Sequence, residues 1–141
     1  MTQRSKWVED THQLQIKMGD GKSKMLSHSE NPEVLKAFIQ HRKDFLQEEI
    51  DELDEALALC DADKAVDAIV DGIVVGIDTL TLMHVDLDEA WNRVYTANIT
   101  KSPGINPTRP NPFGLPDLIK PADFVAPSHE GNLGLFEKAF S

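Results

Sequence analysis

The chain has 141 residues, 40% of them hydrophobic, which is enough for one domain with a buried core. Its formal net charge of −10 and sequence pI of about 4.8 argue against a protein that binds a nucleic-acid backbone. The single cysteine, Cys60, excludes an intrachain disulfide and fits a reducing compartment.

Two helices are expected in the first sixty residues. The first runs from about Lys6 to Met18, and the segment GDGKSK after it reads as a loop. The second begins at Asn31 and Pro32, because asparagine can cap a helix and proline suits its first turn. It is expected to run to about Leu59.

A third helix is expected to run to about Met83, with Asp61 or Asp63 as its cap. Its most hydrophobic stretch, residues 65–83, carries three aspartates. Each would cost about 2.5–3.5 kcal/mol at the centre of a membrane. The first ten residues lack the apolar run of a secretory signal. We therefore expect a soluble, cytoplasmic protein with no membrane partner and no nucleic-acid partner.

A fourth helix is expected from Asp86 to about Lys101, because Glu89 follows Asp86 in a capping-box arrangement. Seven of the eight prolines lie in residues 103–127, which predicts an irregular, partly extended tail. No segment shows the alternation of a strand. The pattern predicts an all-α protein with a helical domain at residues 1–101 and a proline-rich tail at residues 102–141. The tail is expected to pack on the body or on a neighbouring subunit.

The second helix is unusually acidic, with six carboxylates and no base in the thirteen residues FLQEEIDELDEAL. At roughly 100° per residue, its apolar arc is set by six residues: Leu35, Ile39, Leu46, Ile50, Leu53 and Leu57. Glu49 falls inside the edge of this arc, and Glu52 follows one turn later. The other acids fit a solvated face: Asp51, Asp54 and Glu55.

The third helix is apolar almost all round, yet Asp67, Asp71 and Asp78 fall within roughly 40° of one another on it. Gly72 and Gly76 lie on the opposite side, where they would permit close approach of another helix. Anions on a buried helix are unfavourable unless cations compensate them.

Cations are scarce in this part of the chain. Residues 48–89 contain fourteen acids and one base, Lys64. A hard divalent ion such as Mg²⁺ or Mn²⁺, which prefers carboxylate oxygen, therefore explains the acids best. The alternative is an acidic stripe that faces a water-filled bundle interior or arginines of a partner subunit.

The segments RKDFLQEEIDELDEAL and AVDAIVDGIVVGID resemble the paired acidic helices of the MazG-like all-α nucleoside triphosphate pyrophosphohydrolases. The family's EExxE motif is met at Glu48, Glu49 and Glu52. The final aspartate of its ExxD motif is met by Asp71, but Ala68 stands where ExxD has glutamate. Asp67 and Asp78 are the candidates to replace that glutamate.

The resemblance extends to both sides of the acidic helices. WVEDTHQLQIKMG is similar to the first helix of the family, and LDEAWNRVYTANITK is similar to its fourth helix with an Asn-x-x-Lys ending, here Asn98 and Lys101. RPNPFGLPDL resembles the proline-rich segment of phage and bacterial members. The size and the tail look most like phage-encoded members, including dGTP-directed, MazZ-like ones. Such a protein would work in the cytoplasm of the host.

The resemblance implies a four-helix MazG-like bundle that acts as a homodimer or homotetramer. The implied reaction is hydrolysis of a (deoxy)nucleoside triphosphate, a purine such as dGTP, to the monophosphate and pyrophosphate. Mg²⁺ or Mn²⁺ would be held by four carboxylates: Glu49, Glu52, Asp67 and Asp71. Glu48 would orient or deprotonate the attacking water.

The other implied residues would bind the substrate. Lys101 and Arg109 would meet phosphate oxygens, and Asn98 belongs to the same substrate-binding ending of the fourth helix. His12 on the first helix would face the base, whereas Trp7 on that helix is expected to pack in the core.

Two further functions stay open. A non-catalytic dimeric helical scaffold with an acidic protein-binding face would show no metal dependence and no nucleotide turnover. A dUTPase-like or dCTPase-like relative would use the same metal chemistry on a different base.

Overall fold

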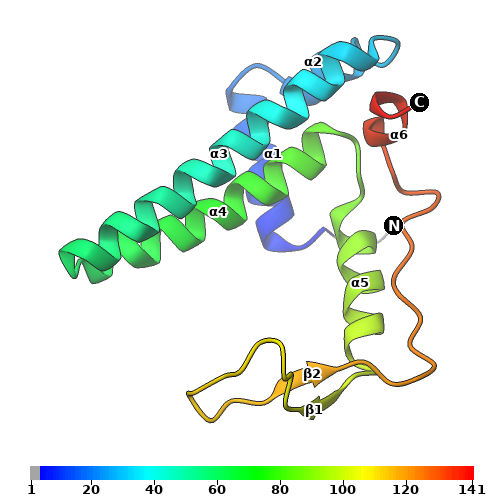
Figure 1. The fold of residues 1–141 in the computed structure, drawn as a ribbon. Coiled ribbons are helices and arrows are strands. Elements are labelled where there is room, and N and C mark those ends of the chain that lie inside the picture. The colour runs from blue at the N-terminus through cyan, green and yellow to red at the C-terminus, as the bar shows by residue number, and fades with distance from the viewer. Residues whose placement is uncertain (1–3) are drawn as a thin grey trace. The chain divides into compact units, whose positions relative to one another are not determined.

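The computed structural model describes residues 4–141, so the first three residues of the stretch read for a secretory signal lie outside the described part. The described residues are mostly helical, which confirms the all-α fold. The helices are α1 (Lys6–Lys17), α2 (Gly21–Leu26), α3 (Pro32–Leu59), α4 (Ala62–Leu82), α5 (Leu87–Asn98) and α6 (Leu135–Ala139). Two short strands, β1 (Ser102–Gly104) and β2 (Asp117–Ile119), complete the fold (Figure 1).

Contacts within the chain divide it into two compact units. The first unit ends at Asp88 and resumes at Gly131–Ser141, and the second is Glu89–Glu130. The first unit thus contains α1 to α4 and α6. The expected boundary between helical domain and tail at residue 101 stays a prediction.

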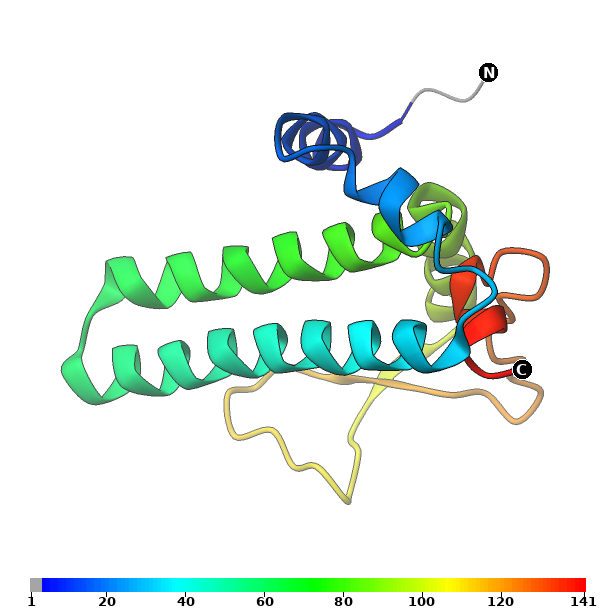
Figure 2. The same ribbon diagram turned by 90° about the horizontal axis from the view of Figure 1, so that it is seen from above.

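The centre of the first unit is an antiparallel hairpin of α3 and α4, which lie side by side along their length (Figures 1 and 2). Cys60, in a left-handed conformation at φ 53°, ends α3. The predicted caps are confirmed at both helix starts. Asn31 accepts a hydrogen bond from the Val34 N–H, and Asp61 accepts one from the Lys64 N–H. Helix α1 packs on α4, on the side away from α3 (Figure 2).

The segment GDGKSK is expected to be a loop, but only its first two residues are, because α2 begins at Gly21. Asp20 adopts a left-handed conformation at φ 56° and accepts a hydrogen bond from the Ser23 N–H. Met25 is the buried residue of this short helix. The turn therefore starts a short helix whose Met25 side chain packs in the core at one end of the α3–α4 hairpin.

The hydrophobic core lies at one end of the hairpin, where α2, the start of α3, the end of α4 and α6 meet. Its buried members are Met25, Leu35, Leu82, Met83, Leu135 and Ala139. Helix α6 is joined to α4 by a hydrogen bond of 2.7 Å from the Leu135 N–H to the Met83 carbonyl oxygen. The end of the tail therefore packs on the helical body within the same unit.

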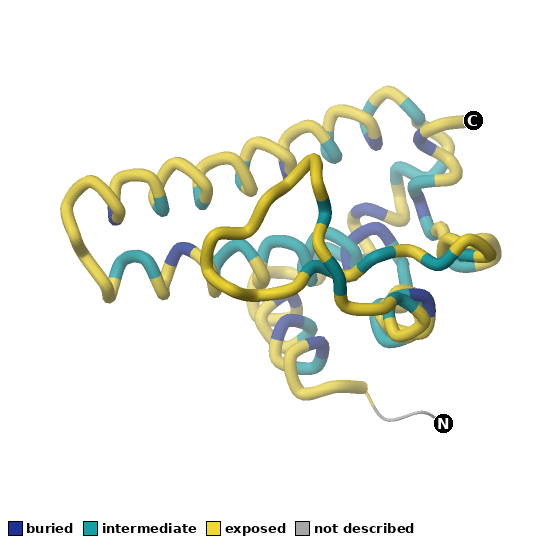
Figure 3. Tube along the Cα trace, turned by 60° about the horizontal axis from the view of Figure 1, so that its bottom comes forward, coloured by how far each residue is buried: buried dark blue, intermediate teal, exposed yellow. Residues whose placement is uncertain are grey.

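The other half of the hairpin carries a large exposed apolar surface, and most of α3 is exposed along its outer side (Figure 3). On α4 the exposed apolar side chains are Val66, Ile69, Val70, Ile73 and Val74. On α3 the expected apolar arc is partly open, because Leu46, Ile50 and Leu57 are exposed. Trp7 was expected in the core, but it is 61% exposed.

No helix of the described residues is long and apolar enough to span a membrane alone, and only α4 and α5 taken together meet that test, by length and composition.

The second unit contains a short antiparallel pair of strands, which the sequence did not indicate. Ser102 pairs with Ile119 and Gly104 pairs with Asp117. Three residues per strand are too few to show a period of two in the sequence, which explains the miss.

Candidate active site

Glu49 lies in the contact between α3 and α4. A Cβ placed on Gly72 of α4 would come within 3.9 Å of the Glu49 Cβ, so Glu49 faces Gly72 across this contact. That distance is an ordinary van der Waals contact, and a Cβ on Gly76 would meet no atom within 4 Å, so neither glycine is required for the approach of another helix within the described chain. One carboxylate oxygen of Glu49, Oε2, is buried and has no hydrogen-bond partner among the described residues.

Four other acids act electrostatically on Glu49. Burial raises the pKa of Glu49 above its ordinary value, and neighbouring negative charges raise it further. In decreasing order of effect these charges belong to Glu52, Asp71, Glu48 and Asp67. The structure thus brings together the acids of the two motifs, three from α3 and two from α4.

The five acids of this cluster, which we call the acid cluster, are Glu48, Glu49, Glu52, Asp67 and Asp71. Within residues 4–141 none of them makes a hydrogen bond or an ion pair through its carboxylate. Acids nearby on the same helices do have partners. Gln47 donates to Asp51 at 2.9 Å, and Lys64 pairs with Glu55 at 2.6 Å. The acid cluster therefore combines five acids that lack a bonded partner with a carboxylate oxygen, Glu49 Oε2, that is also buried.

The donor set of the acid cluster fits a hard divalent cation, since it consists of carboxylate oxygens and includes a buried oxygen without a partner. Over the described range, however, no three Asp, Glu, His or Cys side chains meet at distances that would hold an ion. Glu48, Glu52 and Asp67 are exposed, so their side chains can turn without displacing the core.

Asp78 has a different environment from the one the sequence indicated. Its carboxylate accepts a hydrogen bond of 2.8 Å from Arg42 on α3, and the two side chains are 22% and 11% exposed. Arg42 lies before residues 48–89, so it is not counted among the bases of that acidic segment, although it pairs with one of its acids. The signal was present in the sequence, since Arg42 stands three residues after Ile39 and seven before Glu49, on the inner face of α3.

At the altered ExxD motif, the residue in the glutamate position and the acid that precedes it differ in exposure. Ala68, which stands in the glutamate position, is 2% exposed in the helix contact. Asp67, one residue earlier, is exposed, and its effect on Glu49 is the smallest of the four. Asp67 thus acts electrostatically on Glu49 more weakly than Glu52 and Asp71 do.

The residues expected to bind substrate fall in both units. His12 lies on α1 in the first unit, and its Nδ1 atom is buried without a partner in the described part of the chain. Asn98 and Lys101 belong to the second unit, at the end of α5 and just before β1. The Lys101 ammonium lies 5.3 Å from the centre of the Phe124 ring.

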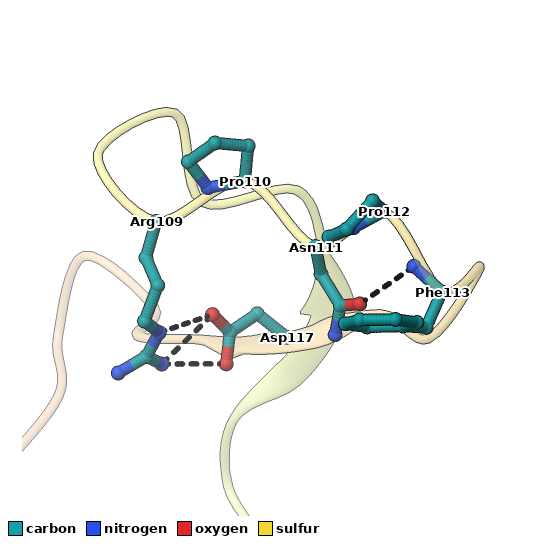
Figure 4. Close-up of a pocket in the computed structure, with 6 residues that line it drawn as sticks. All are labelled: Arg109, Pro110, Asn111, Pro112, Phe113 and Asp117. Carbon is teal, nitrogen blue, oxygen red and sulfur yellow. Dashed lines mark hydrogen bonds and ion pairs between the residues drawn. The ribbon is translucent and has the colours of Figure 1, made fainter. Parts of the chain in front are cut away.

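Arg109 lines a pocket of about 310 Å³ in the loop between β1 and β2 (Figure 4). The other lining residues are Pro110, Asn111, Pro112, Phe113 and Asp117. Its guanidinium donates to both carboxylate oxygens of Asp117, the shortest contact being 2.7 Å. Arg109 thereby lowers the pKa of Asp117. The expected phosphate contact of Arg109 would have to replace or share this ion pair.

Comparison with known proteins identifies the family. The family model described as phosphoribosyl-ATP pyrophosphohydrolase, PRA-PH, matches residues 12–98, which include all of α3 and α4. No curated protein and no solved structure matches the chain. The match covers more than half of the chain and contains the whole acid cluster. The chain therefore belongs to the phosphoribosyl-ATP pyrophosphohydrolase family, within the MazG-like all-α nucleoside triphosphate pyrophosphohydrolase superfamily.

Proposed function

We propose that the protein is a metal-dependent pyrophosphohydrolase that cleaves a purine deoxynucleoside triphosphate, with dGTP as the first candidate, to the monophosphate and pyrophosphate. The observation that carries the proposal is the acid cluster around the buried Oε2 atom of Glu49, which has no hydrogen-bond partner among the described residues. This cluster lies in the segment matched by a family of nucleotide pyrophosphohydrolases. A solvated acidic face alone would not place a carboxylate oxygen out of reach of water and hydrogen-bond donors.

The residues proposed to hold Mg²⁺ or Mn²⁺ are Glu49, Glu52 and Asp71, with Asp67 as the fourth. When bound, such an ion supplies neutralisation of phosphate charge and lowers the pKa of a water molecule. Asp78 is not a ligand in this proposal, because Arg42 already neutralises it at 2.8 Å. The ligands thus come from the middle of the α3–α4 hairpin.

Glu48 is exposed next to Glu49 and makes no ion pair in the described residues, so it is proposed to orient the attacking water or accept its proton. Lys101 and Asn98 are proposed to bind the phosphates, since an ammonium group and an amide can donate to phosphate oxygens. Arg109 is proposed to join them by exchanging Asp117 for phosphate, and His12 is proposed to contact the base.

The proposed assembly is a homodimer or homotetramer in which a second copy covers the exposed side of α3 and α4. The support is the row of exposed apolar side chains beside the acid cluster, among them Ile69, Val70 and Ile73. Contiguous apolar surface of this kind marks an interaction site. A second copy would also remove water from the acid cluster, where low polarity strengthens charge interactions.

Calorimetric titration with Mn²⁺ tests the metal site. Glu52→Gln and Asp71→Asn should each weaken Mn²⁺ binding strongly. In a separate assay of nucleotide hydrolysis, Asp67→Asn should lose most of the activity. Asp54→Asn is the control, because Asp54 is exposed and is not among the main causes of the raised pKa of Glu49. Unchanged Mn²⁺ binding by both Glu52→Gln and Asp71→Asn would place the metal site elsewhere.

A nucleotide panel tests the substrate. It should contain dGTP, dATP, dUTP and dCTP, together with phosphoribosyl-ATP, which the family name carries. Preference for dUTP or dCTP would favour the pyrimidine alternative, and preference for phosphoribosyl-ATP would favour the reaction after which the family is named. The absence of turnover and of metal binding would favour the acidic scaffold.

A further inference from the structure

A chain of polar contacts crosses three helices of the first unit. Arg42 on α3 donates to Asp78 Oδ2 on α4 at 2.8 Å and to Thr79 Oγ1 at 2.9 Å. Asp78 Oδ1 in turn accepts from the Nε2 atom of Gln15 on α1, at 2.6 Å. The Asp78 carboxylate is therefore bonded from α3 through one oxygen and from α1 through the other.

These contacts fix the orientation of the Gln15 carboxamide. An ionised carboxylate only accepts hydrogen bonds, so the amide group that faces Asp78 must be the NH₂ group. The carbonyl oxygen, Oε1, points to the other side, and it is buried without a partner among residues 4–141. Gln15 as a whole is 5% exposed. A buried, oriented acceptor without a donor is unfavourable, and an N–H group that reached it would remove that penalty.

Asp78, which holds the Gln15 carboxamide, lies along α4 from the acid cluster by about the length of a nucleotide. Asp78 follows Asp71 by seven residues on α4, which is two turns or roughly 10 Å along the helix. A nucleotide extends over a comparable length from its phosphates to the far edge of its base. His12, one turn before Gln15 on the same face of α1, adds a second buried polar atom without a partner, Nδ1.

We propose that Gln15 is a specificity residue whose Oε1 atom accepts a hydrogen bond from an N–H group at the edge of the nucleobase, with His12 beside it. This inference rests on the proposed function, because it requires a nucleotide whose phosphates lie at the acid cluster. Arg42 and Asp78 are positioning residues in it, since they hold the carboxamide with the carbonyl oxygen toward the base.

Access to the acceptor requires α1 or a covering side chain to shift, since Oε1 is enclosed in the ligand-free chain. Helix α1 packs on α4 and on the short helix α2. Among the described residues, helix α1 contributes no side chain to the core at the other end of the hairpin, so a shift of α1 that admits a ligand removes no member of that core.

The test compares two hydrolysis-resistant α,β-imido triphosphates in the presence of Mg²⁺, one with guanine and one with unsubstituted purine, which has no N–H donor on its six-membered ring. Calorimetry on the parent protein should show about tenfold tighter binding of the guanine compound, the usual scale for one buried hydrogen bond. The Gln15→Met variant keeps the size of the side chain and should bind the two compounds equally.

Gln13→Met is the matched control, because Gln13 lies on the same helix but is exposed and donates to Glu9. It should keep the tenfold difference. The parent should bind the two compounds equally if a water molecule donates to Oε1 instead of the base. That result would overturn this inference but not the proposed function. An unchanged difference in folded Gln15→Met would do the same.

Failure of the underlying function gives a different result. If the parent binds neither compound, the proposed function is wrong and this inference is wrong with it. The comparison of the two compounds on the parent needs no variant, so equal binding there overturns the inference even if Gln15→Met does not fold.

Discussion

Glu49 shows how the stability of the metal-free protein and its proposed function oppose each other. Its pKa is raised by burial and by four neighbouring carboxylates, so the folded protein binds this proton more tightly than the unfolded chain does. Protonation therefore favours the folded state. As the pH rises from the unfolded pKa of about 4.3 through the raised folded value, this contribution to stability is lost.

Replacing Glu49 by glutamine should accordingly stabilise the metal-free protein at neutral pH. In a chelator, Glu49→Gln is expected to melt at a higher temperature than the parent at pH 7, and the difference should shrink toward pH 4. With Mn²⁺ at about 100 times the dissociation constant, the parent should gain about 2.7 kcal/mol, and the variant should lose most of this gain. Thermal unfolding across pH measures both effects, and equal melting temperatures in chelator at pH 7 would contradict the account.

Individual residues could be predicted from the sequence where one helix decides their position. The location of Glu49 at the edge of the inner face of α3 follows from a period of 3.6 residues, and the structure places it against Gly72. The roles of Arg42 and Gln15 could not be predicted in this way. They depend on which face of α1 meets α4, and no local pattern encodes that contact.

Among the elements, α6 depends most clearly on a contact distant in the sequence. It has five residues, too few for a stable helix in isolation, and it begins after Gly134, whose φ is 53°. A Cβ at Gly134 would lie 2.1 Å from the Met83 carbonyl oxygen, which is the acceptor for the Leu135 N–H. The glycine thus allows the tail to reach the end of α4 and complete the core.

Gly134→Ala should therefore destabilise the protein strongly. The backbone conformation alone should cost about 1–3 kcal/mol, and the clash with Met83 should add to it. Gly131→Ala is the control, because Gly131 also has a positive φ, 80°, but no atom lies within 4 Å of its Cβ position. Urea unfolding measures both, and equal losses for the two variants would show that α6 does not depend on the Met83 contact.

The elements were predictable to the extent that local signals start and end them. Asn31 with Pro32 and Asp61 cap α3 and α4 as their sequences indicate. Helix α2 was missed because glycines at positions 19 and 21 favour a turn, whereas burial of Met25 in the core stabilises a helix. The strands β1 and β2 and helix α6 were missed because they are shorter than any period that the sequence could show.

For the whole molecule, the distribution of apolar surface is the main feature. The core gathers at the α6 end of the hairpin, while the half with the acid cluster leaves Val66, Ile69 and Ile73 exposed. A second copy that covered these side chains would bury apolar surface and thereby stabilise the protein.

The parent is therefore expected to sediment as a dimer or tetramer. Ile69→Asp, which places a charge in the exposed apolar row of α4, should weaken association by about 30-fold or more. Ile16→Asp is the control, because Ile16 is similarly exposed, at 52%, but lies on α1. Sedimentation velocity over a range of concentrations measures the association. A monomeric parent, or unchanged association of Ile69→Asp, would refute the proposed interface.

The central claim is cleavage between the α and β phosphates by a metal ion held on the acid cluster. Its most direct test is incubation of the protein with dGTP and Mg²⁺ or Mn²⁺ in H₂¹⁸O, followed by separation of the products and mass spectrometry. We predict dGMP and pyrophosphate in equal amounts, with ¹⁸O in one of them, no reaction in chelator, and loss of most activity in Glu52→Gln. Release of dGDP and orthophosphate, or undiminished turnover in chelator, would contradict the account.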